Sequence, residues 1–335
     1  MTMDVTLHIG AHRCATTTFQ HFLTRNRVLL ADAGIACWTP DRTRRGLFAG
    51  LVHRPDRIDP VTARRARRAT GLIGVERDRL TAAGVATLLV SDENMMGSVR
   101  ANLRAGALYP DLAARLARFA PAFADCRRIA VGIRAYDTYW ASALAFAVAQ
   151  GHRMPGTLQL DRLAAGGRGW RQVIGDVATA FPLAEIVVWP FERVAARPEA
   201  QLAALSGTPV RVPPLSGARE WHNAGPRRAA LRRILRLRGD DDAALAIPGG
   251  SGRWMPFDTD HRAELRARYS DDLDWLASGA GGSVRLLDAV PDDARADDAR
   301  RDATKDIGYV PATIGRLIAG RTGEGHGNDG RDIMV

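Results

Sequence analysis

The chain has 335 residues, a formal net charge of +10, 46% hydrophobic and 25% charged residues. This length suffices for one large α/β domain or two smaller ones, and the composition is that of a soluble globular protein. The positive charge favours polyanionic partners (nucleotides, nucleic acid or acidic glycans) without choosing among them.

The cysteine content and the N-terminal sequence indicate in which cellular compartment the protein is expected. Three scattered cysteines are too few for a disulfide framework or a zinc site, which indicates a reducing compartment. The N-terminus lacks a basic region followed by an apolar run, and no stretch approaches the roughly 20 apolar residues of a membrane span. We therefore expect a cytoplasmic protein.

The first expected elements are a strand, a loop and a helix. A short apolar run from Val5 ends at Gly10, which predicts a buried strand. Apolar residues from Phe19 to Ala33 recur at helical spacing before Gly34, which predicts one amphipathic helix. A unit of this kind directs backbone N–H groups and the positive end of a helix dipole at one point. The loop between them is therefore a candidate anion site.

The loop departs from the Walker A pattern at its key positions. With Gly10 aligned, Ala15 takes the place of the second glycine and Thr16 that of the lysine. The loop therefore lacks the lysine that a nucleoside triphosphatase needs, which argues against that function. The cation of the loop is Arg13, three residues before Thr16.

A displaced cation followed by a threonine pair resembles the 5′-phosphosulfate loop of the sulfotransferases that use 3′-phosphoadenosine 5′-phosphosulfate (PAPS). It is similar in particular to bacterial members that open with His-Ile-Gly-x-His-Lys-x-Gly-Thr-Thr. The resemblance implies that the backbone amides from Ala11 to Thr17 and the threonine hydroxyls hold the 5′-phosphate. The implied phosphate-binding loop comprises Gly10, Ala11, Arg13, Cys14, Ala15, Thr16, Thr17 and Thr18.

The loop differs from the family pattern at two positions. Arg13 replaces a lysine that lies near the breaking bond, and its planar fork is not equivalent to a point charge. The chain has a single lysine, Lys305, so an arginine here also reflects a general bias. Ala15 replaces a glycine, which is penalised if the position needs a positive φ and harmless if φ is helical.

The next segment combines a short strand with many arginines. Ile35 to Trp38 is expected to be the second strand, and residues 41–68 are rich in arginine. A helix is expected from Pro60 to Ala83. We interpret the arginines as a solvated face, with an electrostatic funnel for an anionic substrate as the alternative.

Val85 to Val90 predicts a buried parallel strand, and polar residues 91–94 follow at its carboxyl end. Ligands bind at this edge of open α/β sheets. Sulfotransferases place a catalytic base at about this point, so Glu93 is the candidate base, with Asp92 as the alternative. The simpler interpretation is that both carboxylates cap or begin a helix.

The second resemblance follows the strand expected from Arg127 to Ile133. Sulfotransferases bind the 3′-phosphate with an Arg at such a strand end and a Ser eight positions later, in the next helix. Arg134 and Ser142 have that spacing, and a guanidinium fork suits a phosphate. Asp137 is expected to cap the helix, while Tyr136, Tyr139 and Trp140 are expected in the core.

The remaining expected elements are mostly structural. Glu185 to Trp189 is a further strand, followed by a structural Phe-Glu pair, Phe191 and Glu192. Helices are expected from Arg227 to Arg238 and from Asp260 to Leu276. Between them, the Gly-rich loop from Pro248 to Trp254 holds Arg253, which the resemblance places on the 3′-phosphate and which is otherwise part of a linker.

Three other side chains near the loop carry weaker signals. His8 and His12 are four residues apart across a strand and a loop, which is not a metal-ligand pattern. His12 is a candidate for neutralising the sulfuryl group in the transition state or, equally, a buried hydrogen-bonding residue. Cys14 lies near a helix N-terminus, but the sequence identifies no base for a nucleophilic thiol.

These observations predict one α/β domain over residues 1–280, with a central parallel sheet of about five strands. The resemblance to sulfotransferases implies a P-loop NTPase-like architecture for it. Residues 281–335 are expected to form a flexible tail with one short element from Tyr309 to Ile318. The family implies metal-free sulfuryl transfer from PAPS to a hydroxyl or amine of a glycan, lipid or small metabolite, with an acidic acceptor allowed. The alternatives are a nucleotide kinase or phosphotransferase and a non-catalytic nucleic-acid- or polyanion-binding protein, for which no recognition motif is present.

Overall fold

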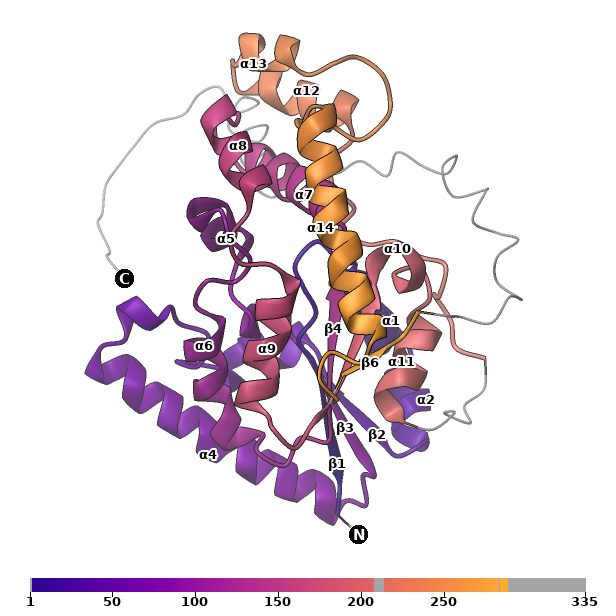
Figure 1. The fold of residues 1–335 in the computed structure, drawn as a ribbon. Helices are drawn as coiled ribbons and strands as arrows, with labels where there is room; N and C mark the ends of the chain where they lie inside the picture. The colour runs from indigo at the N-terminus through magenta and orange to yellow at the C-terminus, as the bar shows by residue number, and fades with distance from the viewer. Residues whose placement is uncertain (1, 208–213, 283, 289–335) are drawn as a thin grey trace, which may run out of the picture.

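The computed structural model describes residues 2–207, 214–282 and 284–288. Six strands form one sheet in the order β2-β3-β1-β4-β5-β6, and every neighbouring pair is parallel (Figure 1). The strands are β1 (Asp4–His8), β2 (Ile35–Trp38), β3 (Thr87–Ser91), β4 (Arg128–Ile133), β5 (Glu185–Pro190) and β6 (Val284–Leu286). The α/β class with a parallel sheet is confirmed.

Helices cover both faces of the sheet, so the central strands are buried on both sides. The larger core holds Leu7 and Val131 under α4 (Pro60–Ala82), α6 (Leu112–Phe119), α7 (Tyr136–Ala149), α9 (Trp170–Ala180) and α14 (Thr259–Ala277). The smaller core, on the opposite face, holds Leu89 and Val187 under α1 (Thr16–Arg25), α2 (Arg27–Asp32) and α11 (Pro198–Ser206). In Figure 1 these two groups of helices lie on opposite sides of the strands.

Further helices and helical turns complete the described part of the chain. The helices are α3 (Pro40–Arg42), α5 (Val99–Ala105), α8 (Thr157–Ala165), α10 (Phe191–Val194), α12 (Arg228–Leu237) and α13 (Asp241–Ala246). Tighter or wider helical turns are η1 (Thr43–Leu47), η2 (Pro55–Arg57), η3 (Glu93–Met95) and η4 (Ala120–Ala122). The predicted helices at 60–83, 227–238 and 260–276 are thus confirmed as α4, α12 and α14.

The single helix expected from Phe19 to Ala33 is wrong. It consists of α1 and α2, with Asn26 as the C-cap of one and the N-cap of the other. The Asn26 side-chain amide donates to the Phe22 carbonyl at 2.8 Å and to the Ser216 carbonyl at 2.9 Å. Asn competes for backbone hydrogen bonds in this way, which ends the first helix and ties it to a distant segment.

The sheet has six strands rather than about five. The additional strand β6 pairs in parallel with β5 at the edge of the sheet and lies within the predicted flexible tail. Its middle residue, Arg285, is exposed and its two apolar residues are only partly buried, so the strand lacks the apolar run that identified the other strands. The short element expected from Tyr309 to Ile318 lies outside the described residues.

Asp137 does not cap α7, since Ala135 is the N-cap. The Asp137 carboxylate is buried and accepts a hydrogen bond from Arg266 of α14 at 2.8 Å. Tyr136, Tyr139 and Trp140 are buried, as predicted. The contact between Asp137 and Arg266 therefore joins α7 to α14.

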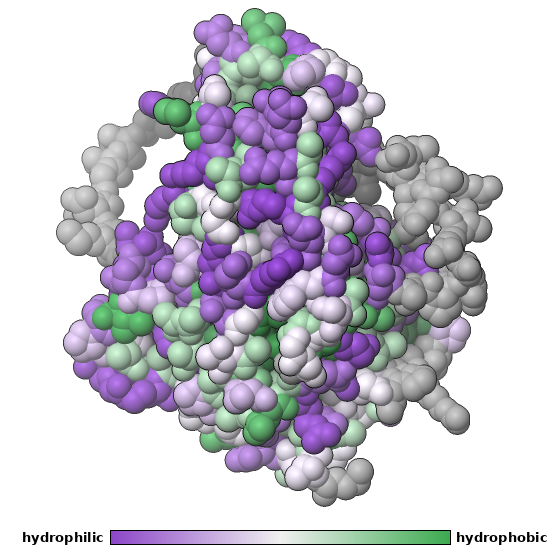
Figure 2. All heavy atoms as spheres, in the orientation of Figure 1, coloured by the Kyte–Doolittle hydropathy of each residue, from purple (hydrophilic) through white to green (hydrophobic). Residues whose placement is uncertain are grey.

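Helix α14 packs against the domain with one of its sides. Its residues Leu265, Tyr269 and Leu276 are buried on that side, while its outer side is hydrophilic in Figure 2. Within the described part of the chain, no helix combines the length and apolar character needed to cross a membrane.

Candidate functional site

A cavity of about 410 Å³ lies at the carboxyl ends of the three central strands. β1 stands between β3 and β4, so the sheet order reverses there, and ligands bind at such a switch point in open α/β sheets. The loop after β1, the polar residues after β3 and Arg134 after β4 meet at this point. The predicted residues in the cavity wall are His12, Arg13, Ala15, Thr16, Thr17, Glu93, Arg134, Ser142 and Arg253.

The loop backbone has an alternating conformation. Arg13 has φ +66° and Ala15 has φ +61°, whereas the intervening Cys14 is not left-handed. Alternation of this kind turns successive N–H groups to one side and forms an anion-binding concavity. Ala15 is also the N-cap of α1 without a side-chain cap, so the first-turn N–H groups add to it.

Gly10 is required by space as well as conformation. Its φ is +58°, and a Cβ there would lie 2.8 Å from the Thr16 hydroxyl oxygen. Thr16 in turn donates its hydroxyl to the Ala11 carbonyl at 3.0 Å, which closes the loop. Gly10 and Ala11 thus shape the loop from behind the cavity wall.

Two predicted amide donors are already engaged. The His12 N–H donates to the Tyr109 hydroxyl at 2.8 Å, and the Cys14 N–H donates to the Ala11 carbonyl at 3.2 Å. Of the amides from Ala11 to Thr17 that were expected to hold a phosphate, those of His12 and Cys14 are therefore occupied within the protein.

The threonine hydroxyls also have separate roles. Thr18 donates to the His222 carbonyl at 3.3 Å and accepts from the His222 N–H at 3.0 Å. Thr17 accepts from the Asn223 amide at 3.4 Å. The hydroxyl of Thr18 holds the segment 221–225 beside the loop, and Thr17 remains in the cavity wall.

The two sequence signals for phosphate binding are in direct contact. Arg13 Nε donates to Ser142 Oγ at 3.1 Å, and the Arg13 guanidinium lies 5.1 Å from the Phe146 ring centroid. Arg134 Nη1 donates to the Arg13 carbonyl at 2.8 Å, and its guanidinium lies 4.2 Å from the Phe191 ring. Burial lowers the pKa of Arg134 to about 10, so it remains cationic at neutral pH.

Glu93 begins the turn η3 directly after β3. Its carboxylate accepts from Gln20 Nε2 at 2.8 Å and from Arg44 Nη2 at 2.9 Å. The pKa of Glu93 lies below its ordinary value: burial acts to raise it, and the charge of Arg44 and the hydrogen bond from Gln20 act to lower it. Glu93 is therefore ionised at neutral pH and faces the cavity.

Asp92 is a structural carboxylate. It is fully buried, accepts from Arg44 Nη2 at 2.8 Å and from Thr43 Oγ1 at 2.5 Å, and caps η3 through the Asn94 N–H. These contacts leave it no face on the cavity, so the alternative assignment of Asp92 as the base is wrong. Its interpretation as a cap is confirmed.

His8 and Cys14 lie in the core. His8 Nδ1 is 2.8 Å from Ser91 Oγ, and burial lowers the pKa of His8 to about 4. Burial raises the pKa of Cys14 to about 12, so its thiol is protonated at neutral pH. Neither side chain lies in the cavity wall. Within the described residues, no group of three or more His, Cys, Asp or Glu side chains could hold a metal ion.

Several residues of the site were not anticipated. Arg44 belongs to the arginine-rich segment interpreted as a solvated face, yet it bridges Asp92 and Glu93. The segment 221–225 contributes Trp221 and Gly225, where a Cβ would lie 2.9 Å from Arg13 Nη2. No pattern in the sequence marks either feature, because both depend on distant segments that pack together.

Comparisons with protein-family models, with curated proteins and with solved structures return no match for this chain.

Proposed function

We propose that the protein is a PAPS-dependent sulfotransferase with the P-loop-like architecture of that family. The observation that carries this proposal is the contact between the loop after β1 and the start of α7, through Arg13, Arg134 and Ser142. PAPS carries anionic groups at both its 3′ and 5′ positions, so its site needs two anion subsites in one cavity. The two sequence signals supply these subsites side by side.

Each end of the cavity suits a different part of the nucleotide. Arg134, Ser142 and Arg253 are the groups that would hold the 3′-phosphate, because a guanidinium and a hydroxyl donate to phosphate oxygens. The loop amides and the N-terminus of α1 would hold the 5′ end. Phe146, Phe191 and Trp221 line the same cavity and offer aromatic faces to the adenine.

PAPS supplies the sulfuryl group and the leaving nucleotide. Glu93 accepts the proton of an acceptor hydroxyl or amine as the acceptor atom forms its bond to sulfur and the bond from sulfur to the bridging oxygen breaks. Its carboxylate is ionised and retains acceptor capacity beside the contacts to Gln20 and Arg44. Arg13 stabilises the negative charge that develops on the departing 5′-phosphate.

The first test is calorimetric titration of the full chain with 3′,5′-ADP, 5′-AMP and ATP without magnesium. Binding of 3′,5′-ADP well above the other two supports the proposal. Equal or absent binding of all three contradicts it, and preference for ATP with magnesium supports a phosphotransferase instead.

Variants locate the 3′-phosphate. Ser142→Ala removes one hydroxyl, and Arg134→Ala removes a buried cation, so both should weaken 3′,5′-ADP more than 5′-AMP. A hydrogen bond to a charged group contributes about 1.5–3 kcal/mol, which corresponds to roughly ten- to hundredfold in affinity. Arg79→Ala is the matched control, because this exposed arginine of α4 lies outside the cavity wall.

Glu93→Gln separates binding from transfer. It keeps the shape of the side chain, so it should spare 3′,5′-ADP binding and abolish sulfuryl transfer. Unchanged 3′,5′-ADP affinity in Arg134→Ala would remove the 3′-phosphate assignment, and full transfer by Glu93→Gln would remove the assignment of the base.

A further inference from the structure

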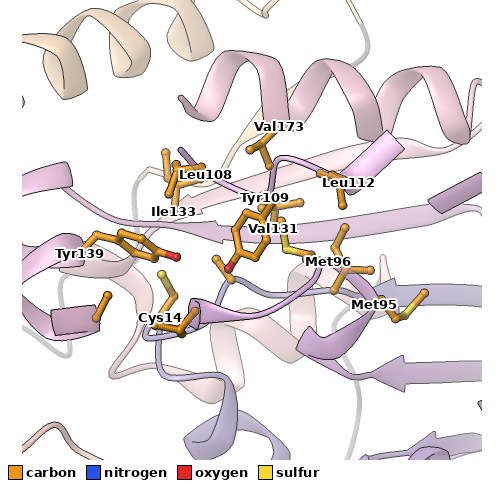
Figure 3. Packing of buried hydrophobic residues seen from close by; sticks show 14 of the residues in the cluster. Cys14, Met95, Met96, Leu108, Tyr109, Leu112, Val131, Ile133, Tyr139 and Val173 are labelled. Carbon is orange, nitrogen blue, oxygen red and sulfur yellow. The ribbon is translucent and has the colours of Figure 1, made fainter. Parts of the chain in front are cut away.

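A chain of buried polar groups lies behind His12. Asn102 in α5, Tyr139 in α7 and Tyr109, which follows α5, are buried. Asn102 Nδ2 donates to the Tyr139 hydroxyl at 2.8 Å, and the hydroxyls of Tyr139 and Tyr109 share a side-chain hydrogen bond. The Tyr109 hydroxyl contacts His12 Nδ1 at 3.2 Å. Figure 3 shows the two tyrosine hydroxyls turned toward the same point, beside Cys14.

The donor and acceptor roles in this series of hydrogen bonds are fixed at Asn102, the residue farthest from His12. Asn102 Oδ1 accepts the backbone N–H of Tyr109 at 3.0 Å, so the other side-chain atom of Asn102 is its NH₂ group. The Tyr139 oxygen therefore acts as an acceptor toward Asn102.

The Tyr109 oxygen accepts the His12 backbone N–H at 2.8 Å, and His12 Nδ1 lies 3.2 Å from the same oxygen. Because one donor is already directed at this oxygen and an imidazole nitrogen is a good acceptor, the Tyr109 proton is directed to His12 Nδ1. If Nδ1 donated instead, the Tyr109 proton would be left with the Tyr139 oxygen, which already accepts from Asn102, and the proton of the buried Tyr139 would face the Cys14 sulfur, which is only a weak acceptor. Buried polar groups are rarely left without a partner, because the lost hydration is not replaced.

We propose that Asn102, Tyr139 and Tyr109 hold His12 as the neutral tautomer with its proton on Nε2, so that the imidazole presents a hydrogen-bond donor to the cavity beside Glu93. Asn94, a neighbour of Glu93 in the cavity wall, hydrogen-bonds to the same imidazole. Burial lowers the pKa of His12 despite the opposing effect of Glu93, which agrees with a neutral ring.

The backbone at Tyr109 supports a functional role for the hydrogen-bonded series Asn102, Tyr139 and Tyr109. Its φ is +46°, a conformation that a bulky residue adopts only when surrounding contacts hold it there. The contacts of its N–H with Asn102 and of its hydroxyl with His12 provide that hold. Strain of this kind is concentrated at ligand-binding and active sites.

The catalytic part of this inference rests on the proposed sulfotransferase function. In that reaction, His12 Nε2–H would exchange its hydrogen bond to Asn94 for one to an oxygen of the sulfuryl group while negative charge redistributes over it. Tyr109, Tyr139 and Asn102 are positioning residues, since they reach the reaction only through His12.

The test is nitrogen NMR of the full chain labelled with ¹⁵N-histidine, with His12 assigned from the spectrum of His12→Gln. We expect a protonated, pyrrole-type Nε2 and a hydrogen-bonded, pyridine-type Nδ1 at neutral pH. A proton on Nδ1, or a doubly protonated ring, overturns the inference without any need for a variant.

Tyr109→Phe then tests the source of the tautomer. It should move the His12 Nδ1 resonance away from its hydrogen-bonded position, whereas Tyr269→Phe, whose hydroxyl contacts Glu192, should not. An unchanged Nδ1 resonance in Tyr109→Phe overturns the role of the chain. In a transfer assay, Tyr109→Phe should lower kcat with unchanged 3′,5′-ADP affinity. Absence of sulfuryl transfer in the wild type would instead refute the proposed function and leave the tautomer result standing.

Discussion

Ala15→Gly should stabilise the protein, although glycine normally destabilises a folded chain. Ala15 has φ +61° and ψ +21°, and a left-handed conformation costs a residue with a Cβ about 1–2 kcal/mol. Glycine removes this cost, but it also increases the conformational entropy of the unfolded chain. That increase lowers the gain in the free energy of unfolding by about 0.4–1 kcal/mol. The expected net gain is about 0.5–1 kcal/mol.

Equilibrium unfolding in urea measures this change as a higher midpoint with an unchanged slope. Ala267→Gly is the matched control, because Ala267 is exposed in the middle of α14, where glycine costs about 1 kcal/mol. The two Ala→Gly changes should therefore shift the midpoint in opposite directions. A loss of stability in Ala15→Gly equal to that in Ala267→Gly would refute the left-handed conformation and, with it, the anion-binding shape of the loop.

Three further outcomes follow from burial and charge. Burial raises the pKa of Cys14, Cys37 and Cys126 to about 12, so a disulfide reagent at pH 8 should modify them far more slowly in the native protein than in denaturant; one fast native thiol would contradict this. The folded state lowers the pKa of Glu93, so Glu93→Gln should lower the free energy of unfolding at neutral pH. The difference in this free energy between wild type and variant should shrink as the pH falls through the lowered pKa, and a difference that grows in acid would contradict the prediction. Arg44→Gln should lower the free energy of unfolding by about 1–3 kcal/mol, measured in urea at pH 7, because the buried Asp92 loses its cation; unchanged stability would contradict it.

The sequence predicts the central strands well because parallel strands buried on both faces form continuous apolar runs. The central strand ending at Ile133 begins within one residue of its observed start, and the edge strand from Ile35 to Trp38, a short apolar run, also has the observed bounds. β6 escaped prediction because an edge strand of three residues, one of them Arg285, has no such run. The break at Asn26 was missed because apolar spacing continues across it, and only the contact with Ser216 reveals its role.

The site was predictable where it depends on local geometry. A strand end followed by a helix brings Arg134 and Ser142 to one side, and their spacing in the sequence is sufficient to propose this. The positions of Arg44 and Gln20 could not be predicted, because each reaches Glu93 from a different part of the chain. One arginine among 47 basic residues carries no signal of its own.

The charges at the two ends of the cavity differ, and for the nucleotide proposed above this difference would set the orientation. At the end near β3, Arg44 is paired with the carboxylates of Asp92 and Glu93. At the end near β4, Arg134 is close to Arg13 and Arg253, which add to the effect of burial in lowering its pKa, while Glu192 opposes them. An anion beside Arg134 and Arg253 would relieve the repulsion between these guanidinium groups, whereas an anion beside Glu93 meets a carboxylate that is part of the cavity wall. The more highly charged phosphate should therefore lie at the β4 end, which leaves the β3 end for an acceptor group that must lose a proton.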